Sequence, residues 1–162
     1  EAYTGTGWTA LPPMPHAAWF ATACVLNGRL HVMGGLGSSA HQVLEMTEEN
    51  GLAWTVKADL PANRFGAARA MHEGKIWVMG GHVGDESSAS VLTYEPDADA
   101  WATAPSLPSP TLYGTATAID GGIVFCADLA YQYKNAAWSE LALPLAGARQ
   151  LGIPVCGTVL LG

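Results

Sequence analysis

The sequence predicts an all-β fold built from repeated four-stranded antiparallel units. Tryptophan recurs at Trp8, Trp54, Trp101 and Trp138, and a Leu-Pro pair follows each one within a few residues. Between the tryptophans lie short runs of apolar and small residues joined by turns that contain glycine. Such runs are typical of β-strands, and no segment holds the apolar spacing of a helix for long enough to compete.

Each repeat is expected to supply four strands in a fixed order. The first two form a hairpin, with turns expected at Asn27-Gly28, Glu73-Gly74 and Gly121-Gly122. The tryptophan segment is the fourth strand. The first strands are predicted at 19–26, 65–72 and 113–119, and the third strands at 42–48, 90–96 and 130–135.

Four antiparallel strands in about 45 to 50 residues make one blade of a β-propeller. The predicted boundaries place the last strand of a preceding blade at 6–15, complete repeats at 16–61, 62–108 and 109–144, and a partial repeat at 145–162. All of these form one domain or segment, residues 1–162, that amounts to about 3.75 blades.

The repeat resembles the kelch motif. The middle copy matches best, with Arg64 opening strand one, Gly80-Gly81 closing strand two, Tyr94 in strand three, and Trp101 with Leu107-Pro108 in strand four. The resemblance implies a kelch-type propeller. Because one fold supports many functions, the resemblance by itself does not identify an activity.

The incomplete blade count leaves three arrangements open. The chain is part of a longer propeller, or a half-propeller whose head-to-tail dimer closes a ring of about eight blades, or a four-bladed ring. The first two are favoured, because an open wedge of blades exposes apolar surface that needs a partner.

Composition narrows the possible partners. The chain is 49% hydrophobic and 13% charged, with a formal net charge of −7, so neither nucleic acid nor an anionic membrane surface is expected as a partner. The sequence contains no spacing typical of a metal site, and we expect no cofactor. Its three cysteines are odd in number and lie in strand-like positions, which favours a reducing compartment such as the cytoplasm.

The candidate ligand-binding residues lie on one face. In a kelch-like layout, the loops from strand two to strand three and from strand four to the next strand one meet at the mouth of the central channel. The longest and most polar of these loops is 82–90. The candidates on this face are His16, Arg64, His82, Asp85, Glu86, Tyr113, Asp128 and Arg149.

Arg64 and Arg149 both open strand one of their repeats, and two roles remain open for them. In kelch domains such arginines are often structural, and some line a pocket that recognises acidic groups. Repeats one and three have Ala18 and Thr111 at this position, so no ring of arginines is built.

The function expected from this pattern is a non-catalytic module that binds a protein or peptide on the loop face, with self-association as a possible means of closing the propeller. No catalytic motif is present. The alternatives are an enzyme of the oxidase or sugar-processing type on a kelch-like scaffold, and a carbohydrate-binding or structural propeller.

Overall fold

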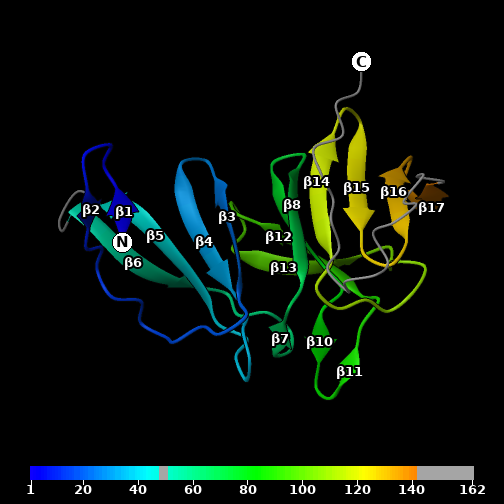
Figure 1. Cartoon of the computed structure of the whole chain (residues 1–162), viewed down its shortest axis with the longest axis horizontal. Helices are drawn as coiled ribbons and strands as arrows, with labels where there is room; N and C mark the ends of the chain where they lie inside the picture. The colour runs from blue at the N-terminus through cyan, green and yellow to red at the C-terminus, as the bar shows by residue number, and fades with distance from the viewer. Residues whose placement is uncertain (48–50, 142–162) are drawn as a thin grey trace.

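The computed structural model describes residues 1–47 and 51–141, and this part of the chain consists of strands and loops without a helix. It contains three four-stranded antiparallel sheets that fan out along an arc (Figure 1). Each sheet is one propeller blade, so the all-β kelch-type propeller predicted from the sequence is confirmed. The predicted partial repeat at 145–162 lies outside the described residues.

The three blades have the predicted strand order. Blade 1 consists of β3 (Thr22–Leu26), β4 (Arg29–Met33), β5 (His41–Thr47) and β6 (Gly51–Lys57). Blade 2 consists of β8 (Ala68–His72), β9 (Lys75–Met79), β12 (Val91–Glu95) and β13 (Ala100–Ala104). Blade 3 consists of β14 (Thr115–Ile119), β15 (Gly122–Cys126), β16 (Ala130–Lys134) and β17 (Ala137–Leu141). The inner strands β3, β8 and β14 lie side by side.

Two smaller sheets were not expected. A three-stranded sheet joins β7 (Arg64–Phe65), β10 (His82–Val83) and β11 (Glu86–Ser87) on the lower side of the arc (Figure 1). A hairpin of β1 (Ala2–Tyr3) and β2 (Trp8–Thr9) stands at the opposite end of the arc from blade 3. Trp8 therefore lies in a strand, as predicted, but this strand is short and pairs with the residues just before it.

The hairpin turns follow the predicted chemistry, with one shift in position. Asn27-Gly28 and Glu73-Gly74 have positive φ at both residues, as a type I′ turn requires. In blade 3 the turn is Asp120-Gly121, one residue earlier than predicted, because Gly122 already pairs in β15. A Cβ on Gly122 would lie 2.1 Å from the carbonyl oxygen of Tyr133, so the strand needs glycine there.

The Gly-Gly pairs that follow strand two are required by the next blade. A Cβ on Gly34 would lie 2.3 Å from the carbonyl oxygen of Arg64, and the backbone nitrogen of Gly35 donates to that same oxygen at 2.7 Å. The nitrogen of Gly81 likewise donates to the oxygen of Thr111 at 2.8 Å. A side chain at the first glycine would separate neighbouring blades.

A hydrogen bond from each strand-four tryptophan also links neighbouring repeats. The indole nitrogens of Trp54, Trp101 and Trp138 donate to the carbonyl oxygens of Pro12, Ala58 and Pro105 at 2.7, 2.8 and 2.8 Å. Each acceptor lies four residues after the tryptophan of the preceding repeat. The same geometry therefore recurs three times along the arc.

Two apolar clusters fill the spaces between blades. Blades 1 and 2 enclose a cluster that includes Met33, Ile76 and Tyr94, and blades 2 and 3 enclose one that includes Trp77, Ile123 and Phe125. Cys24 belongs to the first cluster, where burial raises the pKa of its thiol to about 11. The leucines of two Leu-Pro pairs, Leu60 and Leu107, are buried at the exits of β6 and β13.

We predict that Trp101→Phe lowers the free energy of unfolding by about 1 kcal/mol, because it removes the hydrogen bond to Ala58 and keeps an aromatic ring in the cluster. Urea denaturation would measure the change. Trp19→Phe is the matched control, since the Trp19 side chain is 73% exposed, and it is expected to change stability by less than about 0.5 kcal/mol. An equal loss in both variants would contradict a specific role for the indole N–H.

Candidate functional site

The loop face begins with one unusual residue in each repeat, located just before the inner strand. Phe20, Gly66 and Tyr113 have φ values of 55°, 62° and 59°. The nitrogen of Gly66 donates to the oxygen of Phe20 at 3.0 Å, and the nitrogen of Tyr113 donates to the oxygen of Gly66 at 2.9 Å. This chain of backbone hydrogen bonds crosses from blade to blade and holds the three residues at one level.

Two of these three positions carry bulky aromatic residues in a conformation that favours glycine. Positive φ is rare for such residues and costs on the order of 1–3 kcal/mol each. The side chains of Phe20 and Tyr113 are also largely outside the core, at 59% and 48% exposed. The equivalent residue in blade 2 must be glycine, because a Cβ added to Gly66 would lie 2.8 Å from a ring atom of Tyr113.

The exposed rings belong to an aromatic cluster, which we define as Phe20, Phe65, His82 and Tyr113. The ring centroid of Phe20 lies 6.1 Å from that of Tyr113 and 6.3 Å from that of Phe65. The ring of His82 lies 5.0 Å from that of Phe65. All three repeats thus contribute to one patch on the loop face.

Arg64 lies beneath this patch and not on it. Its side chain is buried, and its two terminal nitrogens donate to the backbone oxygen of Gly80 and to the hydroxyl of Ser90, the latter at 2.6 Å. Burial lowers the pKa of the guanidinium. Its Nε has no hydrogen-bond partner within the described part of the chain. Of the two roles that the sequence left open, this geometry fits the structural one.

The other predicted residues are spread over the loop face. His16 is exposed, and its backbone nitrogen and oxygen bond the buried Gln42 side chain at 2.8 and 3.0 Å. Asp85 and Glu86 are exposed at the tip of the β10–β11 hairpin, and Asp128 is exposed in the tight turn after β15. Arg149 lies outside the described residues.

The structure brings His82 and Tyr113 into the aromatic cluster, together with two residues that the sequence reasoning missed. Phe20 and Phe65 stand just before strand one, in the runs WFATACVL and FGAARAMH. They were assigned to the strands themselves, in which case alternation would have buried some of their side chains. The sequence does carry one signal of their special position: Phe20 and Tyr113 stand where repeat two has Gly66, the residue that favours positive φ.

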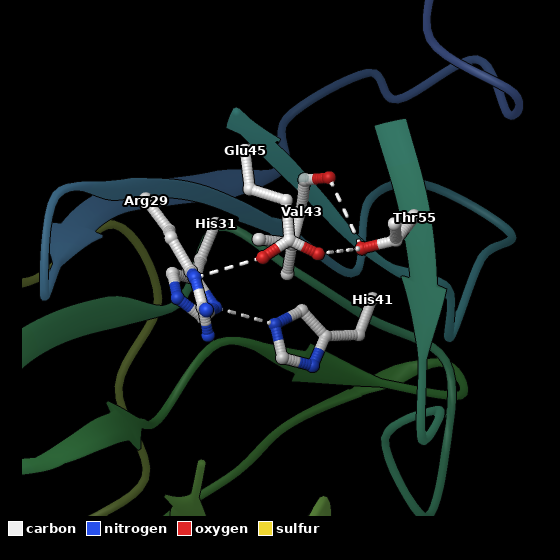
Figure 2. Close-up of polar contacts among 6 residues, drawn as sticks. All are labelled: Arg29, His31, His41, Val43, Glu45 and Thr55. Atoms are coloured by element: carbon white, nitrogen blue, oxygen red, sulfur yellow. Dashed lines mark hydrogen bonds and ion pairs between the residues drawn. The ribbon is translucent and has the colours of Figure 1, made fainter. Parts of the chain in front are cut away.

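A second group of titratable side chains lies between blades 1 and 2 (Figure 2). Nδ1 of His31 on β4 and Nε2 of His41 on β5 lie 2.9 Å apart, and both side chains are buried. The ring of His41 packs edge-on against Tyr94 of blade 2 at 4.4 Å between centroids. Nδ1 of His41 has no hydrogen-bond partner among the described residues.

The surroundings of this pair disfavour protonation. Burial and the neighbouring His31 lower the pKa of His41 to about 4, and burial, Arg29 and Lys57 lower that of His31. Two acidic side chains lie near the pair, Glu45 of blade 1 and Asp99 of blade 2. Glu45 forms an ion pair with Arg29 at 2.8 Å and accepts a hydrogen bond from Thr55 (Figure 2). In the described part of the chain, no group of three or more acidic, histidine or cysteine side chains is placed to hold a metal ion.

No helix among the described residues is long and apolar enough to cross a bilayer.

Comparison with known proteins identifies the repeat. The family model described as "Kelch motif" matches residues 63–108, which cover blade 2. Kelch-like protein 35 from Mus musculus is 28% identical over 121 residues, spanning 72% of this chain and 20% of its own length. Kelch-like protein 33 from Homo sapiens is 30% identical over 120 residues, spanning 70% of this chain and 22% of its own length. The chain therefore spans about a fifth of the length of these relatives.

Two further comparisons extend this result. Alpha-scruin from Limulus polyphemus is 29% identical over 119 residues, which are 68% of this chain and 13% of that protein. Among solved structures, YjhT superposes with a TM-score of 0.71 and 16% identity, covering 81% of this chain and 52% of that chain. At this identity the likeness shows the fold alone.

We predict that Arg64→Ala lowers the free energy of unfolding by about 2–4 kcal/mol, because it leaves the buried Gly80 oxygen and the Ser90 hydroxyl without their donors. Urea denaturation would measure this loss. Arg69→Ala is the control. Its exposed side chain also donates to a backbone oxygen, that of Ala23 at 2.7 Å, and we expect a loss of about 1 kcal/mol or less. Equal losses would contradict the structural role of Arg64.

We also predict that acid destabilises the fold through His41. The unfolded chain takes up this proton near the ordinary pKa of 6.5, whereas the folded chain does so near 4. The unfolded state binds more protons between these values, so stability falls as the pH is lowered from about 6.5 to about 4. The loss is on the order of 2–3 kcal/mol.

Urea denaturation between these two pH values tests the prediction with His41→Asn, which is expected to flatten the pH dependence. His16→Gln alters an exposed histidine outside the pair and is expected to keep the wild-type slope. A wild-type slope in His41→Asn would contradict the assignment.

Proposed function

We propose that this chain, which belongs to the Kelch-repeat family, is a non-catalytic binding module whose loop face holds a protein or peptide ligand. The proposal rests on the aromatic cluster of Phe20, Phe65, His82 and Tyr113. Each repeat contributes to the cluster through the loops that a propeller presents on one face, and such loops commonly carry binding residues on a rigid scaffold.

The exposure of Phe20 and Tyr113 is the observation that carries the proposal. Both residues have positive φ, and strain of this kind clusters at functional sites, where the surrounding structure maintains it. Exposed aromatic side chains in a contiguous patch are also the residues that contribute most to protein interfaces.

Charge on the loop face favours a particular ligand chemistry. Asp85, Glu86 and Asp128 are exposed there, whereas the guanidinium of Arg64 is buried. The β10–β11 hairpin that carries the first two carboxylates also carries His82 of the aromatic cluster. We therefore favour a peptide segment in which an aromatic or aliphatic residue stands beside lysine or arginine, since a cation gains from both the rings and the carboxylates.

Carbohydrate binding is the second candidate function, and Trp19 is the observation that favours it. Its indole is 73% exposed and precedes Phe20 at the start of blade 1. An exposed tryptophan offers a flat apolar surface with a polar N–H, which suits the face of a sugar ring.

A random-peptide phage library panned on the wild-type chain tests the proposed function. We expect enriched peptides to combine apolar and basic residues, and their dissociation constants to rise at least about tenfold for Phe20→Ala and for Tyr113→Ala. Raising the salt concentration should weaken peptide binding to the wild type, because salt screens the attraction between the exposed carboxylates and the basic residues of the peptide.

Val56→Ala is the matched control, because Val56 is 55% exposed on the outer strand of blade 1, away from the cluster. Peptides that bind this variant and Phe20→Ala equally well would place the site elsewhere. Enrichment of no peptide, together with binding to a glycan array that Trp19→Ala abolishes, would favour the carbohydrate function instead.

A further inference from the structure

The N-terminal hairpin reproduces the outer half of a blade. Tyr3 on β1 pairs with Trp8 on β2, as Tyr133 pairs with Trp138 in blade 3. The ring centroids lie 5.5 Å apart at 55° in the hairpin and 5.2 Å apart at 54° in blade 3. β1 and β2 are therefore equivalent to strands three and four of a blade, although each has only two paired residues.

In blades 2 and 3, the tyrosine and tryptophan of this pair face the preceding blade. Tyr94 is 1% exposed and packs against His41 of blade 1, and Tyr133 packs against Trp77 of blade 2 at 4.8 Å. In the hairpin, by contrast, Tyr3 is 62% exposed and Trp8 is 69% exposed. The same aromatic pair thus lacks the surface that covers it elsewhere.

The hydrogen bond that Trp54, Trp101 and Trp138 donate to the preceding repeat has no equivalent at Trp8 among the described residues. Three indoles donate to the carbonyl oxygen four residues after the tryptophan of the preceding repeat, with distances between 2.7 and 2.8 Å. Pro12, four residues after Trp8, already accepts the first of these bonds. Within the described part of the chain, Trp8 itself has no acceptor for its indole N–H.

We propose that Tyr3 and Trp8 dock on blade 3 of a second copy of this chain, in a head-to-tail arrangement. The hairpin and blade 3 stand at opposite ends of the arc, so the two surfaces do not meet within one copy (Figure 1). The chain covers 52% of the YjhT chain on which it superposes, so two arcs of this size match the length of one such chain. Two copies related by a twofold axis would form two identical contacts and close the ring.

Blade 3 offers the surface that this docking needs. The side of blade 3 that faces away from blade 2 carries Thr117 and Ser139, which are exposed, and Gln132, which is half-buried. These positions are equivalent to those of Cys24, Thr55 and Val43 in blade 1, on the side that receives Tyr94 and Trp101. Thr117, Gln132 and Ser139 are uncharged, and the charged side chain on this side of β16 is the exposed Lys134 at the end of the strand. Two aromatic rings can therefore pack on the three positions while Lys134 stays in solvent.

The native mass of the full chain as a function of concentration, measured by analytical ultracentrifugation, tests this proposal. The wild type should sediment as a dimer of the 16.9 kDa chain. Trp8→Ala should sediment as a monomer. Trp8→Phe, which keeps a ring and loses the N–H, should raise the dimer dissociation constant about 30-fold, because each of the two identical contacts loses one hydrogen bond.

A substitution on the opposite surface distinguishes head-to-tail docking from a symmetric hairpin–hairpin contact. Ser139→Arg should dissociate the dimer as Trp8→Ala does, whereas Ser106→Arg makes the same change on an exposed serine outside both surfaces and should leave it intact. Far-UV circular dichroism verifies that each variant is folded. A monomeric wild type at all concentrations, or a dimer that persists in folded Trp8→Ala or Ser139→Arg, would overturn the proposal.

Discussion

The hydrogen bond from each strand-four indole to the preceding repeat is the interaction on which the spacing of the blades depends. Its acceptor always lies four residues after a tryptophan, and two of the acceptors, Ala58 and Pro105, stand two residues before the buried leucines Leu60 and Leu107. At the exits of β6 and β13, the leucine nitrogen donates to the loop between strands two and three, where Ser39 and Ala89 accept. Tryptophan and Leu-Pro therefore recur together because they form one unit that connects a blade to its neighbours on both sides.

Close backbone approach is the second constraint, and it explains the Gly-Gly pairs. The carbonyl oxygens of Arg64 and Thr111 lie against the glycines of the preceding blade. Ala127-Asp128 stands where that pair would be, so any surface that meets blade 3 there must approach it less closely than blade 2 approaches blade 1.

The fold could be predicted from the sequence because its periodic features are backbone requirements repeated in register: glycine turns, tryptophan, and Leu-Pro. The candidate site could not, because it depends on where repeats differ. Strand alternation does not reveal that Phe20 and Tyr113 adopt positive φ. The sequence also does not distinguish an arginine that points outward from one that, like Arg64, points inward and donates to Gly80. The hairpin partner of Trp8 was missed because a strand of two residues carries no periodicity.

The geometry of the binding face depends on the geometry of the blade junctions. The aromatic cluster spans three repeats, so the distance between Phe20 and Phe65 depends on how blade 1 sits against blade 2. That junction contains the buried pair of His31 and His41, whose protonation would place a charge against Tyr94. Acid should therefore separate Phe20 from the rest of the cluster before it disrupts the individual sheets. Ligand binding, which holds the rings together, should in turn oppose protonation of His41, since linkage between the two equilibria is reciprocal.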